Sequence, residues 1–245
     1  MPFLFRLTTH LLTVGLCLCL SGCFVIKNTP KYTLTEGEFK ASGITAGIDS
    51  TNRQVFVMHT DDTIRVYPIV QQMGVKRALP TAILQLEPTR LSAGASRYSF
   101  TNASFDIDFL TIPFKYRPAL SGVARQLNTT LNGAVYVGYR QDRYGVSYRR
   151  NLLGLYNRRF THYGFSIGGF TGLGAAVINP TVTQNQVSIE YDGVVWSKGA
   201  AAILGIDNFT LGLAAGWDVL LDADRTVWLY NSKPWIGLVF GLNIN

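Results

Sequence analysis

The segment FTLGLAAGWDVLL, residues 209–221, decides the fold, because large apolar residues alternate in it with small or polar ones. This period of two is the signature of a β-strand, whose successive side chains point to opposite faces of the sheet. Residues 199–206 and 235–244 repeat the pattern. The Asp207-Asn208 pair supplies turn-forming residues between the first two strands. The C-terminal part of the chain is therefore expected to form neighbouring antiparallel strands.

The face opposite the large residues indicates what surrounds these strands. A soluble sheet places Lys, Glu and other solvated residues on the face away from its core, but here that face carries Gly, Ala, Thr and a rare charge. Large apolar side chains outside and small ones inside suit a narrow closed barrel in lipid. The chain is predicted to be all-β, with an antiparallel up-and-down transmembrane β-barrel of about eight strands over residues 101–245. A small β-rich periplasmic extension is expected over residues 36–100.

The alternation changes parity within residues 105–117, as a β-bulge would cause. The simplest placement of this change groups Leu110 and Ile112 with Phe114 and Tyr116 on one face. A proline within the segment is tolerated at a bulge or on an edge.

Other segments complete the expected set of elements. A soluble-type hairpin is predicted from residues 53–59 and 63–69. The remaining strands are expected at residues 131–140, at 145–150 after a turn at 141–144, at 163–168 with an extension to 177, and at 186–191. The polar stretches 118–130 and 179–185 are expected to be longer loops on one side of the barrel.

The N-terminus carries a secretion signature. Arg6 precedes the apolar run 11–20, which is too short to span a bilayer as a helix. The sequence LSGC, residues 20–23, resembles the lipobox of bacterial lipoproteins. The resemblance implies that residues 1–22 are a lipoprotein signal peptide and that Cys23 receives a diacylglyceryl thioether and becomes the acylated N-terminus. The alternative is an ordinary signal peptide with an incidental cysteine.

Tyrosines and tryptophans fall mostly near the ends of the expected strands, where an amphipathic ring can lie at head-group level. They are Tyr139, Tyr144, Tyr148, Tyr156, Tyr163, Trp196, Trp217, Trp228, Tyr230 and Trp235. The alternative is that they pack in the core of a soluble barrel.

With these features, the C-terminal half resembles small Gram-negative outer-membrane β-barrel proteins. It departs from them at Asn245, where an aromatic residue often ends the chain. Residues 24–28 also lack the aspartate that retains similar lipoproteins in the inner membrane. The resemblance implies a bacterial outer-membrane location, lipid-anchored through Cys23, with residues 23–35 as a tether.

The charge balance fits a membrane protein better than a nucleic-acid-binding one. The formal charge of +7 becomes +6 once Arg6 leaves with the signal peptide. The positive residues are scattered and not interleaved with stacking aromatics, so no nucleic-acid partner is expected. Their only cluster consists of Arg149, Arg150, Arg158 and Arg159. Positive loops near anionic lipid head groups are the simpler explanation.

No metal or cofactor is expected. The three histidines do not share metal-ligand spacing, and no phosphate-binding glycine loop precedes a helical pattern. Asp218, Asp222 and Asp224 approximate a calcium-type run, but ordinary turn chemistry explains aspartates where a strand ends.

No catalytic residue is expected either. His162 and Ser166, on the same face of one strand, are the only pair that a lipid-modifying enzyme could use. Their separation by four residues exceeds one strand rise, so direct contact between them is not expected.

The non-lipid face of the expected strands carries charges of both signs. They are Asp106, Asp108, Lys115, Arg117, Arg140 and Asp218. The interior of a barrel of about eight strands is narrow enough to be filled by side chains. These charges are therefore expected to form a lumen network in which they neutralise one another and plug the barrel.

The sequence thus predicts a monomeric, lipid-anchored outer-membrane barrel with a structural or surface-interaction role. Its expected partner is outer-membrane lipid, and the sequence identifies no protein partner. Two alternatives remain: a soluble periplasmic lipoprotein that binds an apolar ligand inside a lipocalin-like barrel, and a lipid-modifying barrel enzyme. They differ in which strand face is apolar and in whether His162 acts on lipid.

Overall fold

The computed structural model describes residues 34–44, 53–91, 97–206 and 209–242, all within one compact unit, Pro30–Ile244. The predicted signal peptide, the lipidation of Cys23 and the Asp207-Asn208 turn lie outside the described residues. No helix in the described part of the chain has the length and apolar character that a membrane crossing would need.

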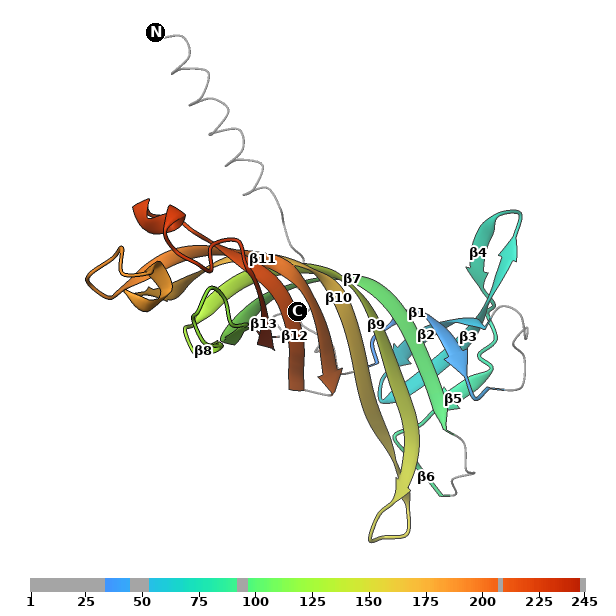
Figure 1. Cartoon of the computed structure of the whole chain (residues 1–245). Coiled ribbons are helices and arrows are strands. Elements are labelled where there is room, and N and C mark those ends of the chain that lie inside the picture. Colours follow the sequence, from blue (N-terminus) through green and yellow to red (C-terminus); the bar gives the residue numbers. More distant parts are fainter. Residues whose placement is uncertain (1–33, 45–52, 92–96, 207–208, 243–245) are drawn as a thin grey trace, which may run out of the picture. The chain divides into compact units, whose positions relative to one another are not determined.

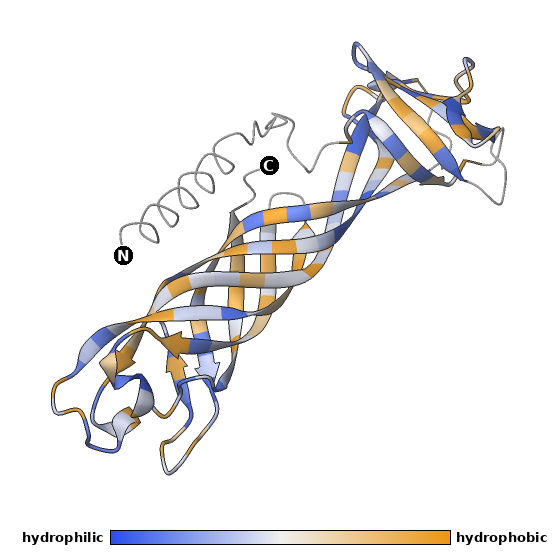
Figure 2. Cartoon of the chain, turned by 90° about the horizontal axis from the view of Figure 1, so that it is seen from above, coloured by the Kyte–Doolittle hydropathy of each residue, from blue (hydrophilic) through white to orange (hydrophobic). Residues whose placement is uncertain are grey.

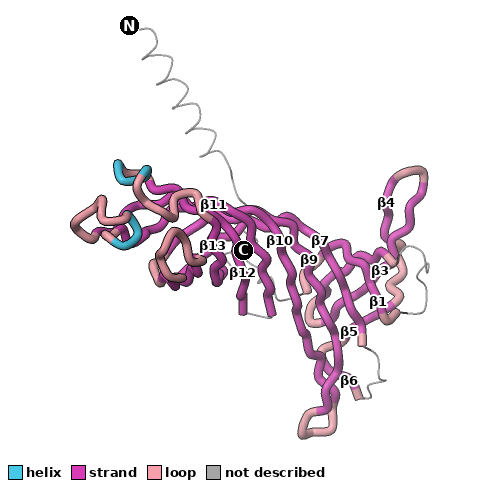
Figure 3. The backbone as a smooth tube through the Cα atoms, in the orientation of Figure 1, coloured by secondary structure: helices cyan, strands magenta, loops and turns pink. Residues whose placement is uncertain are grey.

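The described chain is all-β, as predicted, and its strands pair antiparallel in one sheet. The thirteen strands found there are β1 Gly37–Ser42, β2 Gln54–Thr60, β3 Thr63–Gln72, β4 Val75–Ala78, β5 Leu84–Leu86, β6 Thr89–Arg90, β7 Tyr98–Arg117, β8 Gln126–Asn128, β9 Asn132–Arg150, β10 Tyr156–Ile178, β11 Tyr191–Ile206, β12 Phe209–Leu220 and β13 Pro234–Leu242. Two short 3-10 turns, η1 Thr181–Thr183 and η2 Ala223–Thr226, lie between strands (Figure 3).

Part of this sheet closes on itself. The strands β7, β9, β10, β11, β12 and β13 are hydrogen-bonded in that order, and β13 pairs back to β7 (Figure 1). We call these six strands the ring. Figure 2 shows them wrapping around a common interior.

The ring has six strands in the described residues, not the eight expected, because several predicted strands are parts of longer ones. The predicted turn at 141–144 lies inside β9, which pairs with β10 without interruption from Asn132 to Arg150. The predicted strand at 186–191 is mostly loop, and β11 starts only at Tyr191. Alternation marks where a strand is amphipathic, but pairing decides where it ends.

The predicted bulge is confirmed, but it lies later in β7 than expected. Leu238 of β13 pairs with Phe114 and Phe240 with Thr111, so β7 has an extra residue between these pairs. Leu110 and Ile112 therefore point into the ring, and they do not share a face with the exposed Phe114. The switch of parity falls at the proline, which cannot donate a ladder hydrogen bond.

The N-terminal strands form a sheet continuous with the ring. The predicted hairpin is confirmed as β2 and β3, and β1 joins it to β7 through the pair Lys40 and Thr101. The strands β7, β9 and β10 run on past the ring into this region. Phe39, Val57 and Ile64 pack there against Phe100 of β7 and Tyr144 of β9. Residue 100, the predicted domain boundary, thus lies within a strand that both regions share.

The opposite end of the ring is covered by three long connections. They join β7 to β9, β10 to β11, and β12 to β13, and Figure 1 shows them gathered beyond the ends of the strands. The first two were predicted as long loops on one side, and the third was not predicted. Val123, Val182 and Trp228, one from each connection, pack with Ile178, Val195 and Leu220 of the strands. We call these connections the cap.

Candidate functional site

The outer surface of the ring is a belt of exposed apolar side chains. Leu213, Trp217 and Leu238 are 59%, 43% and 39% exposed, so they do not gather around a common centre. The other large members are Phe105, Ile107, Phe109, Phe114, Tyr116, Leu131, Val135, Val137, Tyr139, Tyr163, Phe165, Ile167, Leu173, Val194, Trp196, Leu204, Ile206, Leu211, Ile236 and Phe240. On β9 and the residue before it, the belt runs from Leu131 to Tyr139. At about 3.4 Å per residue and a tilt of about 40°, this segment covers about 21 Å along the barrel axis, near the ~25 Å apolar band of membrane barrels.

The interior of the ring carries the charges. All six predicted lumen residues, Asp106, Asp108, Lys115, Arg117, Arg140 and Asp218, are 4% exposed or less. The structure also buries polar residues that the sequence did not single out: Asn132, Asp142, Ser197 and Thr183. Asp142 lies on the same face of β9 as Asn132 and Arg140. The sequence did not predict its burial because its segment has the composition of a turn.

Asp218 of β12 organises the polar group nearest the cap. Its carboxylate accepts hydrogen bonds from Lys115 Nζ at 3.0 Å, from Ser197 Oγ at 2.6 Å and from Trp235 Nε1 at 3.0 Å. The Arg117 guanidinium forms an ion pair with the other carboxylate oxygen. Lys115 also donates to Ser197 Oγ and to Asn132 Oδ1, each at 2.9 Å. We call this group the Asp218 cluster.

Aromatic rings complete the surroundings of these two cations. Lys115 Nζ lies 4.6 Å from the centroid of the Trp235 ring, and the Arg117 guanidinium lies 5.1 Å from that of Trp228 and 5.5 Å from that of Tyr230. Cation–π contacts of this kind offset part of the cost of removing a charge from water.

Arg140 of β9 organises a second polar group farther from the cap. Its Nε donates to both oxygens of Asp142, at 2.8 and 3.0 Å, and its Nη1 lies 3.8 Å from Asp106 Oδ2. His162 Nε2 donates to Asp142 Oδ1 at 2.7 Å, and the His162 ring stacks on Tyr144 at 4.8 Å between centroids. With the buried Asp108 nearby in β7, we call this group the Arg140 cluster.

The two clusters alternate with apolar layers along the interior. Between them lies a core that includes Leu110, Ile112, Tyr136, Phe170 and Val239. The cap core closes one end, and the core of the N-terminal sheet closes the other. The order along β9, from Asn132 through Tyr136 and Arg140 to Tyr144, follows these layers in turn. Side chains therefore fill the interior of the ring from end to end.

Close strand packing inside the ring depends on a cross-strand pair of glycines, Gly138 of β9 and Gly168 of β10. A Cβ at Gly168 would overlap the backbone of Val137 and Gly138, and one at Gly138 would overlap the Tyr136 side chain. These positions are glycine because there is no room for a side chain.

Four of the aromatic residues predicted at head-group level are buried instead. Tyr144, Trp228, Tyr230 and Trp235 are 6% exposed or less, because they face the interior or the cap, where the cations and His162 contact them. Tyr139, Tyr163, Trp196 and Trp217 are exposed on the outer surface.

The His162 and Ser166 pair has no catalytic geometry. Both side chains are buried, and each is bound elsewhere: His162 to Asp142 and Ser166 Oγ to the Tyr136 hydroxyl at 2.8 Å. Their positions inside the ring also separate them from the outer surface where lipid would lie.

The described residues contain no group of three His, Cys, Asp or Glu side chains that could hold a metal ion. Asp218 points into the ring, whereas Asp222 caps η2 through the backbone amide of Asp224. Asp222 and Asp224 also accept hydrogen bonds from the hydroxyl of Tyr191, at the cap end of β11 beyond the apolar belt, at 3.0 and 2.7 Å. Burial, and then these two carboxylates, raise the pKa of Tyr191. The three aspartates thus have separate structural roles.

Comparison with known proteins gives no further guide to function: no protein family, no curated protein and no solved structure matches this chain. A function for this protein must therefore be inferred from the arrangement of its charged and apolar side chains.

Proposed function

We propose that this protein is a lipid-anchored outer-membrane β-barrel with a plugged lumen, and that it acts through its surfaces in a structural or interaction role. The observation that carries the proposal is the polarity of the ring. Its outer face is a belt of exposed apolar side chains, and its interior holds seven ionisable side chains: Lys115, Arg117, Arg140, Asp106, Asp108, Asp142 and Asp218.

Water is a poor solvent for such a surface. Soluble monomers keep contiguous apolar patches to about 300–600 Å², whereas this belt includes residues of all six strands of the ring. Hydrocarbon would solvate the belt without cost, and the paired interior charges would remain away from lipid. A lipocalin-like carrier needs the reverse arrangement, with apolar side chains lining an internal cavity for its ligand. No observation in the described residues favours that alternative.

The plugged lumen argues against transport. A pore needs a continuous polar passage, but the two polar clusters are separated by a packed apolar layer that includes Phe170 and Trp235, whose ring centroids lie 5.9 Å apart. We expect the purified protein to produce no stable, large single-channel openings in planar bilayers. Such openings would contradict the plugged lumen.

A surface role agrees with the hairpin that joins β9 to β10. Its tip exposes Leu152 and Leu153 almost completely, and two arginine pairs of the predicted basic cluster flank it. An exposed apolar tip of this kind, flanked by positive charges, is typical of a contact surface.

Removal of the anchor tests the membrane location of the ring. In the variant Cys23→Ser, we expect the protein to remain in the membrane fraction, to need detergent for extraction and to show heat-modifiable migration in gels. Release of this variant as a soluble monomer would refute the membrane barrel and favour the soluble carrier. Lipid turnover abolished by His162→Ala would instead support the enzyme.

A further inference from the structure

Lys198 of β11 is an exception to the polarity of the ring. Between the first and last exposed apolar residues of each described ring strand, it is the only charged residue on the outer face. Other exposed charges on these strands, such as Arg159 and Asp192, lie beyond the belt. Lys198 also takes part in none of the ion pairs formed by the described residues. A lipid-facing lysine is costly near the middle of a bilayer, so its position and neighbours need an explanation.

The neighbours of Lys198 form a small polar and aromatic setting. Its Nζ lies 4.1 Å from the centroid of the Trp196 ring and 5.9 Å from that of Trp217. Thr171 is its cross-strand partner on β10, and Trp217 is its partner on β12. Trp196 Nε1 donates to Thr171 Oγ1 at 2.7 Å, which leaves the threonine hydroxyl its own proton to donate.

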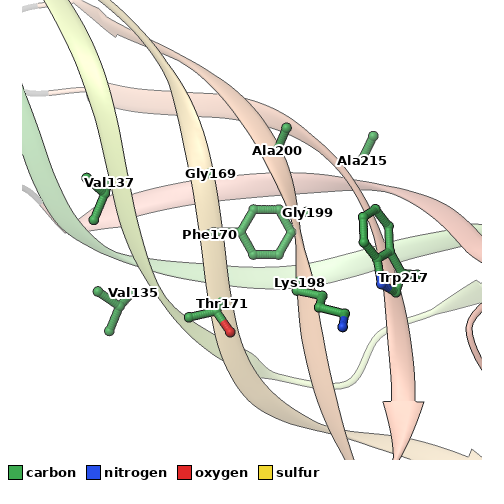
Figure 4. A pocket seen from close by; sticks show the side chains of 10 residues that line it. All are labelled: Val135, Val137, Gly169, Phe170, Thr171, Lys198, Gly199, Ala200, Ala215 and Trp217. Atoms are coloured by element: carbon green, nitrogen blue, oxygen red, sulfur yellow. The ribbon is translucent and has the colours of Figure 1, made fainter.

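A groove in the outer face adjoins this setting (Figure 4). Its floor consists of small residues, Gly169, Gly199, Ala200 and Ala215, on three adjacent strands. Larger side chains border it, with Val135 and Val137 on one side and Trp217 on the other. The groove is thus lined mainly by apolar residues, and Lys198 places a positive charge at one end of it.

The position of Lys198 along the belt allows it to reach a lipid head group. Lys198 is four residues from Val194, the exposed apolar residue nearest the cap on β11, and eight from Ile206 at the other end. It therefore lies on the cap side of the middle of the belt. From there a lysine side chain can extend its ammonium group towards the membrane interface while its stem stays in hydrocarbon.

We propose that this groove binds one anionic phospholipid. The lipid phosphate would lie at Lys198 Nζ and the Thr171 hydroxyl, and one acyl chain would lie over Gly169 and Ala200. Charge complementarity selects an anionic lipid, because the site offers a cation and a hydroxyl donor and no carboxylate. This inference rests on the proposed membrane location of the ring.

Tryptophan fluorescence gives a direct test, because Trp196 and Trp217 flank the site on the outer face whereas Trp228 and Trp235 are buried. The full chain is reconstituted in phosphatidylcholine vesicles that contain a small fraction of lipid with brominated acyl chains, which quench nearby tryptophans. We expect brominated phosphatidylglycerol to bind about fivefold better than brominated phosphatidylcholine, the effect of one basic residue near an anionic group.

Two variants remove different parts of the site. Lys198→Gln removes the charge and should reduce this preference to about one. Gly169→Leu fills the groove and should also reduce it, and this change is compatible with the fold because a Cβ at Gly169 meets only the Gly199 carbonyl oxygen at 3.7 Å. Lys233→Gln, at an exposed loop lysine, is the matched control and should keep the preference.

Each outcome decides between the proposals. Equal quenching by the two brominated lipids in the wild-type protein, or an unchanged preference in Lys198→Gln, would overturn the site and leave the membrane location intact. No quenching by either lipid would overturn the membrane location itself. If Lys198→Gln does not fold, as judged by heat-modifiable migration, the wild-type comparison and Gly169→Leu decide the matter.

Discussion

Lys115 of β7 and Asp218 of β12 are 103 residues apart in the chain, yet they form a hydrogen bond of 3.0 Å inside the ring. Their strands do not pair, because β13 lies between them. Such a contact exists only when the ring is closed, so the Asp218 cluster is a consequence of closure and a stabiliser of it.

Asp218→Asn tests this cluster. Asp218 is the carboxylate that pairs with both Lys115 and Arg117, which are 1% exposed. Its loss leaves two buried cations without a counter-charge, and we expect a decrease of about 3–5 kcal/mol in the free energy of unfolding. Urea unfolding in detergent micelles measures it. Glu38→Gln, which breaks the exposed pair with Lys76, is the control and should cost at most about 1 kcal/mol. Equal stability of the two variants would show that the cluster contributes nothing.

Arg140→Met tests the second cluster through pH. The variant leaves Asp106 and Asp142 buried without the guanidinium, and it should be less stable than the wild type at neutral pH. Protonation removes the charge of Asp142, so the deficit that its lost partner causes should shrink as the pH falls. Unfolding at several pH values checks this, with Arg143→Met, whose exposed side chain bonds Ser99, as control. A deficit that does not change with pH would contradict the assigned pairing.

Gly168→Ala tests strand packing in the ring. A methyl group there overlaps the backbone of β9, so we expect the ring not to close and heat-modifiable migration to be lost. Gly133→Ala is the matched control, because nothing lies within 4 Å of a Cβ at that position. A folded Gly168→Ala protein would mean that β9 and β10 can move apart without loss of the fold.

Phe39→Ala tests the N-terminal sheet. The Phe39 ring makes edge contacts with Phe100 at 6.4 Å and Tyr144 at 5.9 Å, which join β1 to the long strands. Its removal should cost about 3–5 kcal/mol locally. Limited proteolysis should then cut within residues 53–91 before it cuts the ring. Leu91→Ala, at an exposed leucine, should not change the cleavage pattern. Simultaneous loss of both regions would indicate that they unfold as one unit.

Much of the ring could be predicted from local sequence. Alternation along β9 and β12 correctly separated the exposed Val137 and Leu213 from the buried Arg140 and Asp218. It also placed six charged residues on the interior face. The N-terminal hairpin could also be predicted from local sequence, because its two strands flank a polar turn.

Other features could not be predicted in this way. The run Gln141, Asp142 and Arg143 has the composition of a turn, but its pairing with β10 keeps it extended. Trp228 and Tyr230 are buried in the cap core and against Arg117, more than a hundred residues earlier in the chain. The side chain of Ser166 bonds Tyr136, and nothing in the spacing of either residue indicates that contact.

The sequence by itself determined which side of each strand is apolar, because the two faces of a β-strand follow from the alternation of neighbouring residues. Only the tertiary structure decided that six strands of the described chain form the ring, that β9 passes through Asp142 without turning, and that the cap connections cover one end. The physical reason is that strand ends, closure and ion pairs depend on partners that are distant in the chain, and these partners meet only when the whole sheet has formed.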